Sequence, residues 1–189
     1  MVQGTNTDPQ VHDLRRLFTY YKELGEKALA QVTDTDLDRV PHPDGNSIAI
    51  LVKHIAGNLR SRFTDFLTSD GEKPWRQRDA EFEGTYASRE DLRKDWDSGW
   101  GVLFDTLAGL HDADLERVVY IRNEGHTARE ALQRQVAHHA YHVGQIVLLA
   151  RMCVGKEWRS LSIPRGGSQA FNQGKFDQEK GKRHFTEGK

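Results

Sequence analysis

Four stretches of the chain repeat apolar residues at every third or fourth position, and no other feature constrains the fold as strongly. This spacing places the apolar side chains on one face of an α-helix. We expect helices over about residues 9–28, 47–69, 89–107 and 128–153. Helices of this length are marginal alone in water and must bury their apolar faces against one another. The sequence therefore predicts an all-α fold, with a four-helix bundle as the simplest arrangement.

Each expected helix begins after a residue that is typical of a helix start. These start signals are Asp8 before Pro9, Asn46 or Ser47, Ser88 with Asp91, and Thr127 with Glu130. In the last two pairs an acidic residue lies three positions after the hydroxyl residue, which is the spacing of a capping box. The helix boundaries are therefore predicted from local chemistry as well as from periodicity.

The connection between the second and third helices, residues 70–87, is long enough to cross the end of a bundle. It would leave those two helices parallel rather than antiparallel. We expect residues 81–84 and 117–125 to pair as a short β-ribbon. The chain then divides into one bundle domain over residues 1–165 and a polar, peripheral tail over residues 166–189.

The charge balance excludes some classes of partner. Charged residues make up 29% of the chain and the formal net charge is -1, which argues against binding to nucleic acid or to an acidic membrane surface. The longest apolar runs, such as residues 146–150, are too short to span a bilayer, and residues 1–9 lack the pattern of an export signal. Cys153 is the only cysteine, which fits a reducing compartment. We expect a soluble, cytoplasmic protein.

Three histidines lie within five positions of the fourth helix, in the stretch HHAYHVGQI. His138 and His142 are four residues apart, so both imidazoles lie on one helix face and can reach the same metal ion. His139 and His142 are three residues apart and form a competing pair. Sequence spacing alone leaves this choice open.

A third ligand is needed because a transition metal generally has at least three from the protein. His54 lies beside the apolar stripe of the second helix, roughly two turns from its start, while His142 lies about three turns from the end of the fourth helix. If these helices are antiparallel, the two depths match. The alternative is that His54 is a hydrogen-bonded packing residue of the core.

Several stretches resemble the DinB-like (DinB/YfiT-like) superfamily of metal-binding four-helix bundles, in a branch of unknown function. They are SIAILVKHIAGNLRSRFTDF, GEKPWRQRDAEFE, AHHAYHVGQIVLLAR and LSIPRGGSQAFN, and the resemblance covers residues 8–172. In that superfamily one histidine of the second helix and an H-x-x-x-H pair of the fourth hold the metal. The resemblance therefore implies that His54, His138 and His142 are ligands and that His139 is only their neighbour.

Three neutral imidazoles leave a divalent transition metal with open positions, at which it can lower the pKa of a bound water or thiol. Zinc or nickel is the ion we expect first, with iron a further candidate. Asn58 and Gln145 lie one turn beyond His54 and His142 and are expected to orient the imidazoles or to hold a bound ligand. The alternative is that both amides only close contacts between helices.

The resemblance also bears on the reaction. Characterised members include thiol-dependent transferases, which implies S-transfer between a low-molecular-weight thiol and a small-molecule substrate. A metal-dependent hydrolase and a non-catalytic metal-binding stress protein are the alternatives, because a shared bundle does not carry a shared reaction. Relatives often pair through bundle faces, so the resemblance also allows a homodimer.

Other residues are given lesser roles. We expect residues 32–45 and the segment after Cys153 to cover the open end of the site. Arg165 is a weak candidate for binding an anion, since its segment reads more simply as a turn. The fourth helix begins after Glu124 and His126, so both should lie more than about 15 Å from His138. The loop residues Trp75, Arg76, Arg78 and Asp79 are expected to pack on the bundle or on a second subunit.

Overall fold

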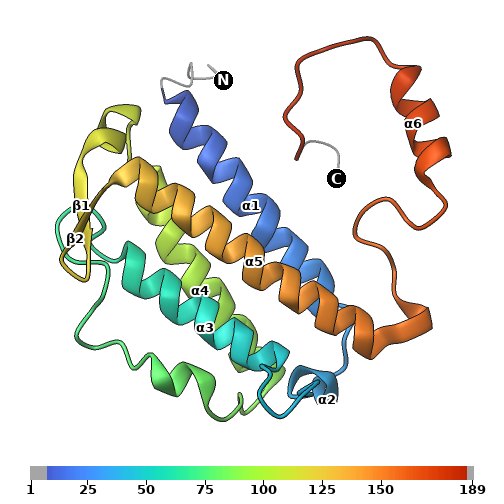
Figure 1. Ribbon diagram of the computed structural model, residues 1–189, viewed down its shortest axis with the longest axis horizontal. Helices are drawn as coiled ribbons and strands as arrows, with labels where there is room; N and C mark the ends of the chain where they lie inside the picture. Colours follow the sequence, from blue (N-terminus) through green and yellow to red (C-terminus); the bar gives the residue numbers. More distant parts are fainter. Residues whose placement is uncertain (1–7, 187–189) are drawn as a thin grey trace.

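The computed structural model of this protein describes residues 8–186, and four long helices dominate it (Figure 1). These are α1 (Pro9–Leu29), α3 (Ile48–Phe63), α4 (Arg89–Ala108) and α5 (Ala128–Val154). The smaller elements are the helices α2 (Asp34–Leu37) and α6 (Ser168–Phe176), the 3₁₀ turns η1 (Asp79–Phe82), η2 (Asp112–Glu116) and η3 (Gly155–Glu157), and the strands β1 (Val118–Ile121) and β2 (Glu124–Thr127). The fold is thus mostly helical, as expected, with one small two-stranded sheet.

The predicted caps explain where three of the long helices begin. The hydroxyl of Ser47 accepts from the backbone N–H of Ile50 at 3.2 Å, and that of Ser88 accepts from the N–H of Asp91 at 3.1 Å. Thr127 caps α5 in the same way, and its own N–H donates to the carboxylate of Glu130 at 2.8 Å. These bonds satisfy N–H groups that have no partner inside the helix.

The start of α1 differs from the expected cap. The carboxylate of Asp8 accepts from the backbone N–H of Asp112, at 2.8 Å, instead of from its own helix. Asp112 returns the interaction, because its carboxylate accepts from the N–H of Val11 at 2.9 Å. The first turn of α1 is therefore capped by η2, and this exchange ties the two segments together.

The long crossover leaves α3 and α4 parallel, as predicted. Gly99 of α4 lies against Ala56 of α3 so closely that a Cβ on Gly99 would be 2.7 Å from the Cα of Ala56. Further along both helices, the hydroxyl of Thr106 donates to the carbonyl of Phe63 at 2.9 Å. In both contacts the two partners are 43 residues apart in the sequence, so the helices run in the same direction.

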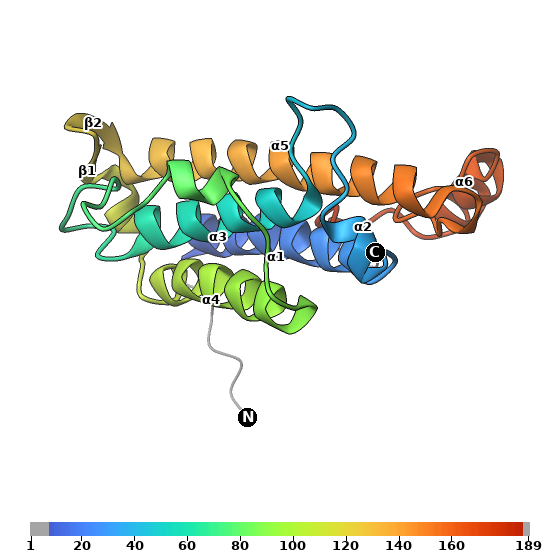
Figure 2. The ribbon, with the colours of Figure 1, turned by 90° about the horizontal axis from the view of Figure 1, so that it is seen from below.

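The remaining two long helices, α1 and α5, are parallel to each other and antiparallel to the first pair (Figures 1 and 2). Arg89, at the start of α4, donates to the carbonyl of Leu29, at the end of α1, at 3.0 Å. In Figure 2, α3 lies between α5 and α4. The apolar stripe predicted for the second helix lies at the centre of the bundle and is buried; its members are Leu51, Ile55, Leu59, Phe63 and Phe66.

Helix α3 ends at Phe63 rather than near Ser69, which is where periodicity placed its end. Thr64 is extended and Asp65 has a positive φ of 50°, so the helical hydrogen-bond pattern cannot continue. The carbonyl of Asp65 instead accepts from the N–H groups of Thr68 and Ser69 in a separate turn. Phe66 lies in this turn and its side chain is buried in the core. Its spacing from Phe63 therefore matched the apolar pattern of a helix.

The predicted β-ribbon between residues 81–84 and 117–125 is wrong. Strand β1 pairs with β2 in an antiparallel hairpin, with Ile121 opposite Glu124. Arg122 and Asn123 form its two-residue turn with φ values of 56° and 63°, the left-handed conformation that suits such hairpins. Residues 79–82 form η1 instead and pack along α3. A hairpin closed by two residues needs far less chain ordering than a pairing across 30 residues.

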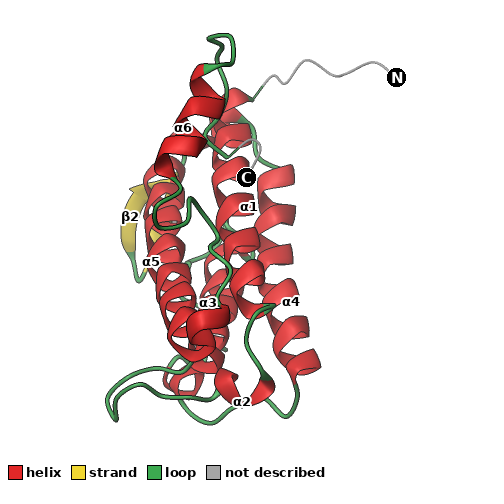
Figure 3. Cartoon of the chain, turned by 90° about the vertical axis from the view of Figure 1, so that its right-hand side faces the viewer, coloured by secondary structure: helices red, strands yellow, loops and turns green. Residues whose placement is uncertain are grey.

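The chain after α5 lies at the edge of the bundle. Trp158 and Leu161 pack on the core, whereas α6 has no buried residue and lies apart from the four long helices in Figure 1. In Figure 3, where this side faces the viewer, α6 lies in front of the bundle. Near the end of the described chain, the ring of Phe185 contacts that of Tyr20 at a centroid distance of 5.5 Å. Within residues 8–186, no helix combines the length and apolar character needed to cross a membrane.

Candidate metal centre

The antiparallel packing of α3 and α5 brings three histidines together. His54 comes from α3, and His138 and His142 come from one face of α5. The Nε2 atom of His138 lies 3.3 Å from Nε2 of His54 and 3.1 Å from Nε2 of His142. The matching depths expected from the sequence are therefore found, and all three rings converge at one point.

The spacing of these nitrogens fits a shared metal ion. Zinc–nitrogen bonds are about 2.0–2.1 Å long, so two ligand nitrogens lie about 3.4 Å apart at a tetrahedral angle and about 2.9 Å apart at a right angle. The two observed distances, 3.1 and 3.3 Å, fall between these limits. The ligand nitrogens of all three rings lie within 4.8 Å of one another, so one ion can be reached from each.

Hydrogen bonds fix the tautomers of His54 and His142. Nδ1 of His54 is 2.9 Å from Oε2 of Glu81, and Nδ1 of His142 is 2.9 Å from Oε1 of Gln145. Both oxygens are acceptors, so each Nδ1 carries the hydrogen and each Nε2 presents a lone pair. These lone pairs meet at Nε2 of His138. A proton on Nε2 of His138 could form a hydrogen bond to only one of these two nitrogens. A metal cation can bind the lone pairs of all three Nε2 atoms, that of His138 included.

The environment keeps the imidazoles of His138 and His142 neutral, which is the form that binds metal. Burial, together with the neighbouring rings of His142 and His54, lowers the pKa of His138 to about 3. Burial also lowers the pKa of His142, against the opposing effect of its hydrogen bond to Gln145. A ring that cannot take up a proton at neutral pH keeps its lone pair available.

Behind His54 lies a buried ion pair that the sequence did not reveal. Arg76 donates from Nε to Oε1 of Glu81 at 2.8 Å and from Nη2 to Oε2 at 2.9 Å. The side chains of Arg76 and Glu81 are only 2% and 9% exposed. Burial alone would raise the pKa of Glu81, but the bonds from His54 and Arg76 outweigh it and hold the pKa below its usual value. The carboxylate is therefore ionised and orients His54.

One sequence signal could have located Glu81. Gly57 lies inside α3, one turn after His54, where a glycine weakens a helix without an evident reason. In the structure a Cβ at Gly57 would lie 2.3 Å from Oε1 of Glu81, so the glycine makes room for the carboxylate against the helix. Glycine within a helix beside a candidate ligand thus marked the approach of another segment.

The structure also decides between the two histidine pairs. His139 is fully buried on the other side of α5, with its ring centroid 5.4 Å from that of Trp100 and 6.1 Å from that of Phe18. Burial lowers its pKa well below the usual value. His139 is a core residue, and the ring that meets His54 and His142 is that of His138.

The two expected supporting amides differ in what they do. Gln145 contacts His142 directly, as described above. Asn58 lines the pocket in front of the histidines, and its Oδ1 atom is buried without a hydrogen-bond partner within residues 8–186. The side chain of Gln145 therefore orients an imidazole, whereas Asn58 lies in the pocket wall and makes no hydrogen bond to any of the three histidines.

A pocket of about 260 Å³ opens above the three rings. Its walls are formed by the crossover, the hairpin and the facing sides of α3 and α5; besides the histidines they comprise Asn58, Arg62, Arg76, Arg78, Phe82, Arg122, Arg134 and Gln135. The expectation that residues 32–45 and the segment after Cys153 cover the site is wrong. The crossover covers it instead, because η1 packs along α3 and places Phe82 5.0 Å from the ring of His54.

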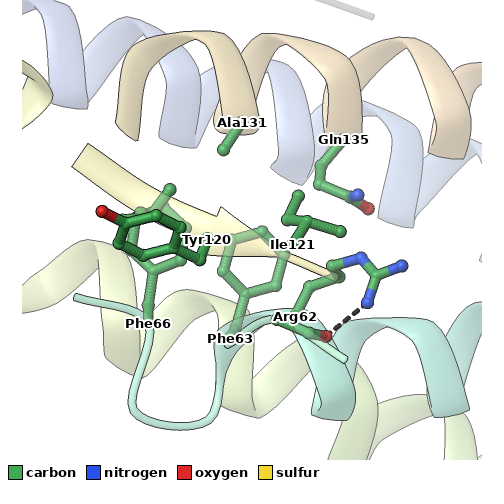
Figure 4. A pocket seen from close by; sticks show the side chains of 9 residues that line it. Arg62, Phe63, Phe66, Tyr120, Ile121, Ala131 and Gln135 are labelled. Carbon is green, nitrogen blue, oxygen red and sulfur yellow. Dashed lines mark hydrogen bonds between the residues drawn. The ribbon is translucent and has the colours of Figure 1, made fainter. Parts of the chain in front are cut away.

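Arg62 and Gln135 separate this pocket from a small apolar cavity beneath the hairpin (Figure 4). Figure 4 shows both side chains at one edge of that cavity, with Phe63, Ile121 and Ala131 around it. The guanidinium of Arg62 donates to the carbonyl of Gly71 at the beginning of the crossover. This bond connects the end of α3 with the segment that continues to Glu81.

Several other residues considered from the sequence lie outside the pocket wall. Glu124 and His126 are in strand β2, and Cys153 is near Asp36 at the opposite end of α5. Arg165 is exposed in the turn before α6. Of the loop expected to pack on the bundle, Arg76 is buried, whereas Trp75, Arg78 and Asp79 are largely exposed.

Comparison with known proteins identifies a matching family. A family model described as "Protein of unknown function (DUF1572)" matches residues 6–167. No curated protein and no solved structure matches the chain. The expectation of a family of unknown function is therefore confirmed, and the link to the DinB-like superfamily stays a prediction.

Proposed function

The chain belongs to this family of proteins of unknown function, and we propose that it is a metal-dependent enzyme whose ion is held by His54, His138 and His142. The observation that carries the proposal is the convergence of three imidazole nitrogens at the floor of an open pocket. Structural zinc sites are usually closed by four protein ligands, whereas catalytic sites have three and leave a position for substrate. Three ligands below a pocket support the catalytic alternative.

The surrounding residues would hold this centre in place. Glu81 accepts the Nδ1 hydrogen of His54, and Arg76 fixes both oxygens of Glu81. Gln145 accepts the Nδ1 hydrogen of His142. Such bonds fix the ring orientation and raise the basicity of the ligating nitrogen. A divalent ion bound there supplies a Lewis acid that lowers the pKa of a thiol or a water molecule.

We propose thiol-dependent S-transfer as the reaction. Within residues 8–186 no carboxylate lines the pocket, since Glu81 is behind His54 and is occupied by Arg76. Hydrolysis at a metal generally also needs a positioned general acid or base. A thiol needs only to be deprotonated, and positive charges nearby favour the thiolate. The thiol proton leaves to solvent, the sulfur forms a bond to an electrophilic carbon, and the leaving group departs with its electron pair.

The first experiment measures the metal. Protein purified without a nickel column should contain close to one divalent ion per chain, and His54→Ala and His142→Ala should lose it while retaining their helical circular dichroism. His12→Ala is the matched control, because His12 is exposed on α1 and outside the pocket. Wild-type protein that folds but does not retain a transition metal would refute the metal centre.

The second experiment tests the reaction. The metal-loaded protein should accelerate the displacement of chloride from monochlorobimane by a small thiol, and the His54→Ala variant should not. Metal-dependent cleavage of an ester or amide without thiol would identify a hydrolase instead. A bound metal that only raises the melting temperature would indicate a non-catalytic metal-binding protein.

A further inference from the structure

The pocket above the histidines carries a concentration of positive charge. Five arginines line it: Arg62, Arg76, Arg78, Arg122 and Arg134. Three carboxylates pair with members of this set: Glu72, Glu81 and the exposed Asp79. Five guanidinium groups against three carboxylates leave two positive charges around a cavity of about 260 Å³. The net charge of the whole chain is only -1, so this excess is a local feature.

Two of the arginines form the framework of the pocket. Arg76 is 2% exposed and fully engaged with Glu81. Arg62 is 8% exposed, donates to the carbonyl of Gly71 and lies 3.3 Å from Glu72. Both are fixed by bonds within the protein, and they have little freedom to rearrange around a ligand.

The other three lie at the mouth and are less compensated. Arg122 shares the single carboxylate of Glu72 with the two framework arginines. The guanidinium of Arg78 lies over the ring of Phe82, at 5.2 Å, and its nearest carboxylate is the fully exposed one of Asp79, 3.9 Å away. Arg134 makes no ion pair with any residue from 8 to 186.

Arg134 is also placed in register with the metal ligands. It precedes His138 by four residues on α5, so Arg134, His138 and His142 lie on one face of the helix. Four residues correspond to roughly 6 Å along the helix axis. A group held by Arg134 would thus lie about one helical turn from an atom that contacts the three histidines.

The pocket wall contains two further groups without partners. Oδ1 of Asn58 and Oε1 of Gln135 are buried and have no hydrogen-bond partner within residues 8–186. Both residues are at most 5% exposed, and both line the pocket. Buried polar atoms in folded proteins almost always have a partner. The two amides give the pocket wall polar as well as charged character.

We propose that this pocket binds the anionic end of a small substrate, a carboxylate or phosphate group, through Arg78, Arg122 and Arg134. The planar guanidinium group can form paired hydrogen bonds with a carboxylate or a phosphate, and the negative charge of either complements the excess positive charge of the pocket. The inference rests on the proposed function for one point only: the reacting atom of the same molecule lies over the histidines. A volume of about 260 Å³ suits a metabolite-sized molecule.

The test compares charged and neutral probes on the metal-loaded protein at low ionic strength, where exposed charges are least screened. Inorganic phosphate and succinate represent the two anionic groups, and succinamide is the neutral counterpart of succinate. Isothermal titration calorimetry measures each affinity for the wild type, Arg134→Gln, Arg78→Gln and the double variant. Arg151→Gln is the matched control, since Arg151 is exposed on the same helix but outside the pocket.

Each pocket substitution should weaken binding of the preferred anion by about tenfold, because a hydrogen bond to a charged group contributes roughly that much. The double variant should lose more than either single variant, and Arg151→Gln should bind as the wild type does. The tighter of phosphate and succinate identifies the group. Equal affinities in all variants, or succinamide binding as tightly as succinate, would overturn the inference.

Metal content is measured on the same samples, which separates this inference from the proposed function. None of the three arginines is a metal ligand, so every variant should retain the ion of the wild type. If the metal is present and neither anion binds, the inference fails and the metal centre stands. If the metal is absent and arginine-dependent anion binding remains, the proposed function fails and the inference stands.

Discussion

Replacing Glu81 with glutamine separates the role of its charge from that of its shape. In the structure its carboxylate accepts three hydrogen bonds, one from Nδ1 of His54 and two from Arg76. A glutamine side chain offers one oxygen and one NH₂ group in the same space. At least one of the three donors would then face another donor, and Arg76 would lose its principal counter-charge. The substitution should therefore affect both stability and metal binding.

The expected loss of stability is about 3 kcal/mol, the lower end of the range for removing one partner of a buried ion pair. The lower end applies because Glu72 lies 3.6 Å from Arg76 and retains part of the compensation. For a chain of this size the loss corresponds to a decrease in melting temperature of roughly 6–12 °C. Metal affinity should fall by about 10- to 100-fold, as is usual when the hydrogen-bond partner of a ligating histidine is changed.

Thermal unfolding of the metal-free protein measures the first effect, and competition with a chelator of known affinity measures the second. Asp79→Asn is the matched control, because it makes the same chemical change two residues away on a fully exposed carboxylate. The control should differ little from the wild type in either assay. A Glu81→Gln protein with wild-type melting temperature and wild-type metal affinity would refute the assignment of Glu81 as the group that orients His54.

Further substitutions test the packing and the histidine assignment. Gly99→Ala should destabilise the protein, because the added Cβ would lie 2.7 Å from the backbone of Ala56, whereas Gly101→Ala meets open space and should raise the melting temperature slightly through helix propensity. His139→Leu should retain stoichiometric metal and His138→Leu should lose it, which metal analysis of both variants decides. Asp70 holds the turn of the hairpin through bonds from the N–H groups of Asn123, Glu72 and Arg122, which outweigh the effect of burial and lower its pKa. Its stabilising contribution should be complete above the usual value of 3.8 and should disappear as the pH falls through the lowered pKa of the folded state, so acid unfolding of Asp70→Asn should depend less on pH than that of the wild type.

Local chemistry in the sequence determined much of the framework. The caps Ser47, Ser88 and Thr127 lie where the helices begin, because a side-chain oxygen satisfies N–H groups only three residues away. Helix geometry also indicated that either His138 or His139 shares a face with His142, but it left the choice between these two pairs open. The length of the crossover indicated that α3 and α4 are parallel, since a shorter connection would have reversed the chain.

Only the tertiary structure decided which distant groups complete the site. Glu81 reaches His54 across 27 residues because η1 packs on α3 at Gly57, and residues 79–82 showed no pattern that distinguishes this turn from a strand. The convergence of arginines from α3, the crossover, the hairpin and α5 is likewise a result of packing. Periodicity reports which face of a helix is apolar, but contacts between segments far apart in sequence depend on how those faces dock, and that geometry is set by the complete core.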